Sequence, residues 1–369
     1  MKIKINKPDI FVTGILIAAM FLFSSYAIIS FAQTQTSSNH TQTSSNHTQT
    51  SSNHTQTSSN HTQTSSNHTQ TSSKQESNLN PIFITHRASN SVLTLPSEKV
   101  WPAGRDMTYI DATDDGKIIV ATSTGDDQIV VFNGTNGNII NKIKVGEYPT
   151  GIKISPNKKF VIVPNQLPGT ASIIDLEKMK VIDEIKVGKI PHNTVFSPNG
   201  TKAYLTIQGE DKVVVFDVND SFKKTAEIKV AQGPHNLDIT GDGKLLFVAN
   251  AASSDVAAIN TTTLKIIKKI PVTLGHHGID ISPNDKRAYV SGVGDDKISV
   301  IDVDKLELIK QVTVGKGPHG IRTSSDGKNI YVAVTNTNEL VVINTDTLAV
   351  SEKIPVGKIP FWIAVPGNT

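Results

Sequence analysis

The 369-residue sequence contains no cysteine. Disulfide bonds, thiolate metal centres and cysteine nucleophiles are therefore excluded, and the fold must be stabilised by its core alone. The sequence also lacks a P-loop, a dinucleotide-binding glycine fingerprint, an HExxH motif and a recognisable catalytic serine motif. It therefore does not predict the nucleotide-dependent, zincin-type or serine-dependent enzymes that carry these motifs.

A strong excess of charge of one sign is also missing. The chain has 36 lysines and arginines against 33 aspartates and glutamates, for a net charge of +3. The basic residues are mostly lysines spread along the chain rather than gathered in one patch. A nucleic-acid partner is therefore not predicted.

Residues 1–32 have the pattern of an export segment. Lys2, Lys4 and Lys7 precede an almost unbroken apolar run over residues 10–32, which is long enough to span a bilayer. The sequence Ser30-Phe31-Ala32 fits a cleavable signal peptide, whereas the length of the run fits an uncleaved membrane anchor equally well. Both alternatives place the rest of the chain outside the cytoplasm, secreted or anchored at the cell surface.

Residues 33–80 are predicted to form a disordered, low-complexity stalk. The heptad TQTSSNH repeats here without an apolar residue, so the segment can form neither a core nor a coiled coil. Each heptad contains an N-glycosylation sequon, which predicts a glycoprotein if the chain is exported. The five sequons begin at Asn39, Asn46, Asn53, Asn60 and Asn67.

The remainder, residues 81–369, is built from an internal repeat. Corresponding positions recur every 42 or 43 residues, and each unit contains four short alternating segments separated by hairpin-type turns. These register positions are Thr108, Thr150, His192, His235, His277, His319 and Phe361. Four antiparallel strands per unit predict the blade of an all-β propeller.

The two ends of the repeat region predict how the ring closes. The unit that begins at Phe361 has only one strand, whereas residues 82–101 read like the other three strands of a unit. We therefore expect a seven-bladed β-propeller in which the C-terminal strand joins the N-terminal strands in one blade. The fourth segments are rich in lysine, and we interpret these lysines as protection of outermost edge strands against association.

The unit "GHHGIDISPNDKRAYVSGVGDDKISVIDVDKLELIKQVTVG" closely resembles the YVTN-type β-propeller repeat. The resemblance covers about residues 82–369 and implies a surface-layer-like propeller protein. It does not assign an activity, since propellers of this kind serve several functions. Surface proteins and polysaccharides are the partners it suggests, with the membrane added if the N-terminal segment is uncleaved.

Four register positions are histidines, and these are the candidate metal ligands: His192, His235, His277 and His319. In a propeller they form an arc around one mouth of the central channel. Imidazoles with nearby carboxylates suit copper or zinc, and acidic hairpins at residues 125–127, 209–211 and 294–296 lie on the same face. The alternative is structural, with each imidazole hydrogen-bonded to a backbone carbonyl of the next blade.

The histidine arc is similar in placement to the copper-binding histidines of the nitrous oxide reductase propeller, and the propeller lactonases also have histidines near their strand starts. Thr108, Thr150 and Phe361 interrupt the ring, however, and no cysteine-bound copper domain or acid/base constellation accompanies it. The leading hypothesis is a cell-surface binding or scaffold module that uses the arc to bind a metal ion or another ligand and has no assigned catalytic residue. A copper-dependent oxidoreductase or electron-transfer component is the alternative, and a lactonase-like hydrolase is a third.

Three residues after the register positions, the sequence places charges that we expect to pair between adjacent blades. Asp111 is matched with Lys153, and Asp280 with Arg322. Trp101 and Trp362 both fall in the closing blade and are expected to pack its seam.

Overall fold

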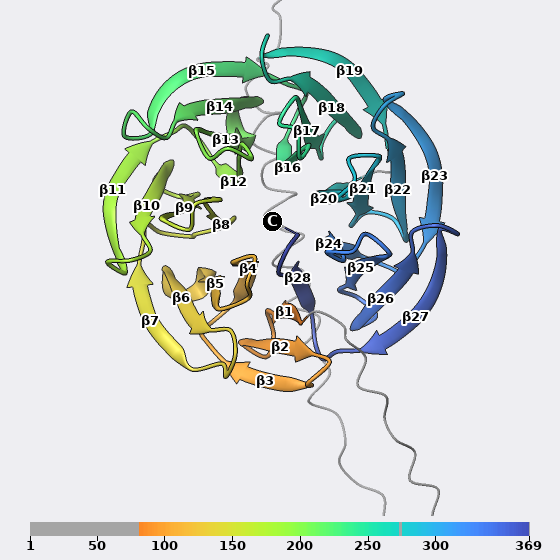
Figure 1. Cartoon of the computed structure of the whole chain (residues 1–369), viewed down its shortest axis with the longest axis horizontal. Coiled ribbons are helices and arrows are strands. Elements are labelled where there is room, and N and C mark those ends of the chain that lie inside the picture. The colour runs from red at the N-terminus through yellow and green to blue at the C-terminus, as the bar shows by residue number, and fades with distance from the viewer. Residues whose placement is uncertain (1–80, 273–274, 369) are drawn as a thin grey trace, which may run out of the picture. The chain divides into compact units, whose positions relative to one another are not determined.

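A computed structural model describes residues 81–272 and 275–368 as seven four-stranded antiparallel sheets arranged in a ring (Figure 1). The predicted export segment and stalk, residues 1–80, lie outside the described residues. Within the described part, no helix is long and apolar enough to cross a membrane. The predicted all-β, seven-bladed fold is confirmed.

Six blades follow one another along the chain, each with its first strand innermost and its fourth outermost. Blade 1 contains β4 (Met107–Ala112), β5 (Ile118–Ser123), β6 (Gln128–Asn133) and β7 (Ile139–Lys144). Blade 2 contains β8 (Lys153–Ile154), β9 (Phe160–Asn165), β10 (Thr170–Asp175) and β11 (Lys180–Lys186). Blade 3 contains β12 (Pro191–Phe196), β13 (Lys202–Ile207), β14 (Lys212–Asp217) and β15 (Lys223–Lys229).

The next three blades repeat this order. Blade 4 contains β16 (Pro234–Ile239), β17 (Leu245–Asn250), β18 (Asp255–Asn260) and β19 (Lys265–Pro271). Blade 5 contains β20 (His276–Ile281), β21 (Arg287–Gly292), β22 (Lys297–Asp302) and β23 (Glu307–Thr313). Blade 6 contains β24 (Pro318–Thr323), β25 (Asn329–Val334), β26 (Glu339–Asn344) and β27 (Ala349–Pro355). Two 3₁₀ turns, η1 (Thr124–Asp126) and η2 (Gln208–Glu210), connect second and third strands.

The closing blade combines the two ends of the described chain, as the repeat pattern predicts. Its order is β28 (Pro360–Ala364), β1 (Ile82–His86), β2 (Ser91–Leu95) and β3 (Lys99–Pro102). β28 pairs antiparallel with β1, for example through Ile84 and Ile363. The ring is therefore closed by backbone hydrogen bonds rather than by a loop.

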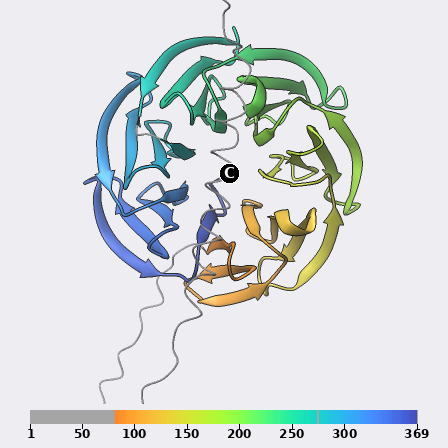
Figure 2. The same ribbon diagram turned by 180° about the vertical axis from the view of Figure 1, so that it is seen from behind.

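The core lies between blades rather than within one sheet. Ile298 and Val300 of blade 5 belong to the same buried cluster as Ile330 and Val332 of blade 6. The middle strands are buried on both faces because each sheet packs against two neighbours, which explains their nearly continuous apolar sequences. The lysine-rich fourth strands form the circumference in both views (Figures 1 and 2).

Candidate functional site

The register residues are presented toward the axis by a repeated irregularity of the innermost strands. In β12 the pairing with β13 skips between Pro191 and Thr194, so that His192 and Asn193 lie in a bulge. The same shift occurs in β16, β20 and β24. A bulge redirects a side chain from its regular alternation, and here it fixes which residue of each first strand lines the axis.

A left-handed backbone residue stands two positions before every register residue. It is a glycine before three of the histidines (Gly233, Gly275 and Gly317), but Ile190 before His192, with φ of 53°. Ile359 precedes Phe361 with φ of 55°. Branched residues rarely adopt this conformation, so the shape of this turn is imposed by the propeller and not by local preference.

The structure brings the four histidines together as a series of closely packed rings, with neighbouring planes tilted by 40–61°. The centroids of His192 and His235 lie 3.4 Å apart, those of His235 and His277 3.7 Å, and those of His277 and His319 3.6 Å. Phe361 continues the series, 3.7 Å from His319. The arc is therefore continuous over five register positions.

Tyr109, which the sequence analysis did not select, completes the circle. Its ring lies 5.6 Å from His192, 5.7 Å from Phe361 and 4.6 Å from Trp362. Tyr109 is buried, and its hydroxyl is 3.5 Å from His192 Nε2. Trp362 thus packs across the seam between the closing blade and blade 1, as expected, and aromatic side chains fill the axis beside the histidines.

The imidazoles are held by neighbouring backbone and amide groups. His319 Nδ1 is hydrogen-bonded to the carbonyl oxygen of Phe361 at 3.1 Å, and Asn236 Nδ2 lies 3.0 Å from His235 Nδ1. The bond to Phe361 is the contact that the structural interpretation of the arc predicts. The imidazole of His192 also lies near the backbone of His235, although its buried Nδ1 makes no well-formed hydrogen bond within the described part of the chain.

Burial keeps His192 and His319 neutral at physiological pH. Loss of solvation lowers the pKa of His192 to about 3, and the pKa of His319 lies well below its usual value through burial and the nearby Arg87. Neutral imidazoles are the form that binds metals. Within residues 81–272 and 275–368, however, no group of three or more His, Asp or Glu side chains is arranged to hold an ion.

The acidic hairpins expected around the arc are engaged elsewhere. Asp126 is paired with Arg105 at 2.6 Å and also accepts its backbone N–H at 2.7 Å. Glu210 is paired with Lys212 at 2.7 Å and accepts the N–H of Lys189 at 2.7 Å. In blades 1 and 3, these carboxylates bind the backbone just before the first strand to the hairpin between the second and third strands.

A second polar layer lies further along the first strands, and both of its predicted ion pairs are present. Lys153 Nζ is 3.3 Å from Asp111, and Arg322 is 3.1 Å from Asp280. All four side chains are largely buried, which gives these pairs a role in fixing the order of the blades.

The aspartates of this layer also bind backbone across the blade boundary. Asp111 accepts the N–H of Ile154, Asp238 that of Ile281, and Asp280 that of Thr323, at 2.7–2.8 Å. One blade thus supplies a carboxylate to the innermost strand of the next. Asp111 and Asp280 were predicted from their cationic partners, whereas the role of Asp238 was not, because it has no cationic partner among the described residues.

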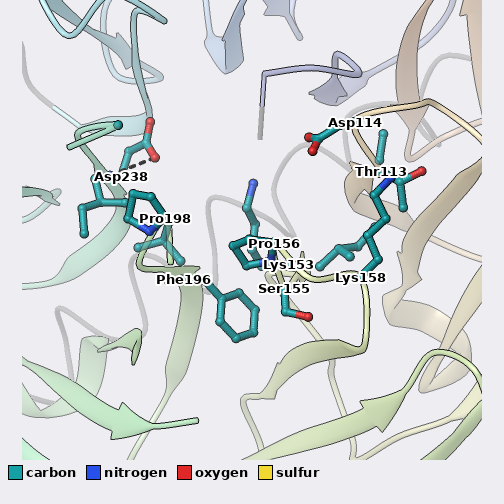
Figure 3. A pocket seen from close by; sticks show the side chains of 14 residues that line it. Thr113, Asp114, Lys153, Ser155, Pro156, Lys158, Phe196, Pro198 and Asp238 are labelled. Atoms are coloured by element: carbon teal, nitrogen blue, oxygen red, sulfur yellow. Dashed lines mark hydrogen bonds between the residues drawn. The ribbon is translucent and has the colours of Figure 1, made fainter. Parts of the chain in front are cut away.

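Beside this layer is a cavity of about 120 Å³, lined by residues of blades 1 to 4 (Figure 3). Lys153 and Asp238 lie in its wall together with the apolar side chains of Pro156, Phe196 and Pro198. We call it the axial cavity. His235 is near the start of β16 and Asp238 near its end, so the cavity and the histidine arc lie at opposite ends of the innermost strands.

Comparison with known proteins supports the fold. The family model described as "YNCE-like beta-propeller" matches residues 175–324. This match and the seven blades agree with the YVTN-type resemblance of the sequence. None of the curated proteins searched matches the chain.

Solved structures with the same architecture include hydrazine synthase from Kuenenia stuttgartiensis, at 17% identity and a TM-score of 0.64 over 72% of this chain and 92% of that one. A functionally unknown protein from Desulfotomaculum acetoxidans gives 16% identity and a TM-score of 0.70 over 78% and 98%. The dihydro-heme d1 dehydrogenase NirN in complex with DHE gives 16% and 0.60 over 79% and 76%. At these identities the likeness shows the fold alone.

Proposed function

We propose that this chain is an exported cell-surface binding module whose circumference docks onto an acidic protein surface. The localisation rests on the export pattern of residues 1–32. The binding role rests on one observation: the exposed large apolar side chains are concentrated on the outermost strands. Seven of the eight such residues in the described part lie on β3, β7, β11, β19 and β23, namely Val100, Ile139, Ile140, Ile182, Ile267, Leu308 and Ile309.

The densest part of this surface spans blades 4 and 5. Ile267, Lys268 and Lys269 are exposed on β19, and Leu308 and Ile309 are exposed on β23, the next strand along the circumference (Figure 1). We call these five residues the rim patch. The aliphatic side chains lie beside two lysines that form no ion pair with any described residue. This combination suits a partner that offers apolar contacts within an acidic surface.

The composition favours a protein over a polysaccharide as the partner. The only aromatic residue of the outermost strands is Trp101, and it is buried. The strands therefore offer no exposed flat ring against which a sugar could lie. Polysaccharide binding is retained as an outcome of the test.

The test is zero-length carboxylate-to-amine cross-linking on cells that export the full chain. We expect Lys268 and Lys269 to form cross-links to aspartates or glutamates of one other protein, and the variant Lys268→Glu/Lys269→Glu to lose them. The matched control is Lys223→Glu/Lys224→Glu, the same charge change on β15, which has no exposed large apolar residue. Equal loss in both variants, or association abolished by polysaccharide cleavage, would contradict protein docking at the rim patch.

A second candidate function is binding of copper or zinc by His192, His235, His277 and His319. The buried Nδ1 of His192, which makes no well-formed hydrogen bond among the described residues, favours it. Titration of the purified full chain with each metal, beside a variant with all four histidines changed to asparagine, tests this candidate. One equivalent bound by the parent and lost in the variant supports a metal site; no uptake by the parent rejects it.

The enzymatic alternatives require more than the metal. A copper-dependent oxidoreductase needs an open coordination position, and a lactonase-like hydrolase needs an acid/base pair within reach of its substrate. The closely packed and largely buried rings offer little access from solvent. We therefore rank both below a binding role, and turnover assays on the metal-loaded chain distinguish them from it.

A further inference from the structure

The turn after β28 occupies the side of the axis next to blades 5 and 6, outside the wall of the axial cavity. The last described turn, residues 365–368, is fixed to blades 5 and 6, where Asn368 Nδ2 donates to the carbonyl oxygen of Thr323 at 2.6 Å and to Asp280 at 3.2 Å. The C-terminal end lies at the centre of the ring in Figure 1. The end of the axis beside blades 5 and 6 is thus covered, and a cavity is left beside blades 1 to 4.

The polar layer next to the cavity contains one more carboxylate than cation. Its three aspartates are Asp111, Asp238 and Asp280, whereas its cations are Lys153 and Arg322. Asp238 makes no ion pair with any residue that the structure describes, and its carboxylate lies in the cavity wall. Burial and the charge of Asp280 raise the pKa of Asp238 to about 6, against the opposing effects of Arg322 and Lys153. At neutral pH a negative charge is left for a cation to balance.

The cationic side of the cavity is Lys153. Its ammonium contacts Asp111 at 3.3 Å, which uses one of its three donors. Figure 3 shows its side chain extending into the space between Asp238 and Asp114. Two N–H donors therefore remain for a ligand on the side away from Asp111.

We propose that the axial cavity binds a small zwitterion, with its ammonium group against Asp238 and its carboxylate against Lys153. A volume of about 120 Å³ limits the ligand to a few carbon atoms, as in a short amino acid. Pro156, Phe196 and Pro198 supply an apolar wall for its carbon chain. The proposal is independent of the rim patch and of the histidine arc.

The test is calorimetric titration of the purified full chain at pH 7.5 with four probes: alanine, β-alanine, ethylamine and propionate. We expect a zwitterion to bind with one-to-one stoichiometry and each singly charged probe to bind at least about 10-fold more weakly, because it leaves one charged wall unpaired. No binding of either zwitterion, or ethylamine binding as tightly as they do, would overturn the proposal.

The variant Asp238→Asn tests the assigned carboxylate. Asparagine keeps an oxygen that can accept the N–H of Ile281 but removes the charge. We expect zwitterion affinity to fall about 10- to 100-fold. The matched control is Asp242→Asn, an exposed turn carboxylate of the same blade outside the cavity wall, which should bind like the parent. Unchanged affinity in Asp238→Asn would exclude this site, and the probe series on the parent decides the question if that variant does not fold.

Discussion

His319 Nδ1 lies 3.1 Å from the carbonyl oxygen of Phe361, so the imidazole of blade 6 is hydrogen-bonded to the backbone of the closing blade. The same imidazole packs against the Phe361 ring, with the two planes tilted by 39°. One histidine therefore fixes both the backbone and the side chain of the next register residue. Histidine suits this position because it combines a flat ring with a polar atom that can reach the neighbouring strand.

Burial of these rings predicts that acid destabilises the propeller well above the carboxylate range. The unfolded chain binds protons at His192 and His319 below pH 6.5, whereas the folded chain resists them until about pH 3 at His192. The free energy of unfolding should therefore decrease as pH falls from 6.5 toward 3, by at most about 1.4 kcal/mol per pH unit for each histidine. Urea unfolding at a series of pH values measures this slope.

Asp238 has the opposite effect on the pH dependence of the free energy of unfolding. Because burial and the neighbouring Asp280 raise its pKa to about 6, its contribution to stability grows as pH falls through 6. His319→Gln should reduce the acid-dependent loss, and Asp238→Asn should increase it. Stability that stays flat between pH 7 and 4.5 in Asp238→Asn, which lacks this offset, would mean that the histidines are protonated in the folded state.

The left-handed position before each register residue predicts unequal effects of similar substitutions. Gly317→Ala should destabilise the protein by about 1–2 kcal/mol, since alanine is strained at a φ of 76° and its Cβ would lie 2.8 Å from Asn336. Ile190→Gly should change the free energy of unfolding by less than about 0.5 kcal/mol, because relief of strain offsets the lost half-buried side chain. Chemical unfolding of both variants checks the contrast, and equal losses would argue against a strained turn at Ile190.

Two ion pairs of similar length should differ in their contribution to stability, because one is buried and the other is exposed. Asp280→Ala removes the partner of Arg322 and three further hydrogen bonds, and should cost about 3 kcal/mol or more. Asp304→Ala breaks the exposed pair with Lys286, 2.9 Å long, and should cost less than about 0.5 kcal/mol. Thermal and urea unfolding measure both; a small effect of Asp280→Ala would show that the pair is dispensable for blade order.

Tyr109 should matter for its ring rather than its hydroxyl. Tyr109→Ala leaves a void between His192, Phe361 and Trp362, with an expected loss of about 3–5 kcal/mol. Tyr109→Phe keeps the ring but removes the hydroxyl, with its long contact to His192 and its hydrogen bond to the Asn236 side chain, so its loss should be about 1 kcal/mol. If Tyr109→Phe proves as costly as Tyr109→Ala, the hydroxyl contributes more than its 3.5 Å distance implies.

The repeat period gave the blade number, the closing pairing of β28 with β1 and the pairs Asp111–Lys153 and Asp280–Arg322. These features follow from equivalent positions in equivalent units, so spacing is sufficient to predict them. The seam position of Trp362 followed in the same way.

Other features depend on local backbone geometry and side-chain rotation, which the repeat spacing does not specify. Tyr109 follows its register residue by one position, and only the local backbone decides which of two adjacent side chains reaches the axis. The contacts between the imidazoles depend on side-chain rotation. The repeat pattern predicts that the four histidines lie close together, but it cannot distinguish packed rings from a set of metal ligands. The metal assignment stays a prediction. The axial cavity was missed because it depends on how the side chains and turns of blades 1 to 4 pack around the axis, which the repeat spacing does not contain.

The closing pairing also sets an order of events during synthesis. β1, β2 and β3 are made first, but the inner strand of their blade, β28, is made last. Until Pro360–Ala364 are available, Phe83 and Ile84 belong to a sheet with an unpaired inner edge. The closing blade therefore cannot be completed until β28 has been synthesised. A propeller interrupted before β28 would expose an unpaired strand edge at the seam, and such an edge favours aggregation. The inner edge of β1 is therefore covered only once β28 has been synthesised and has paired with it.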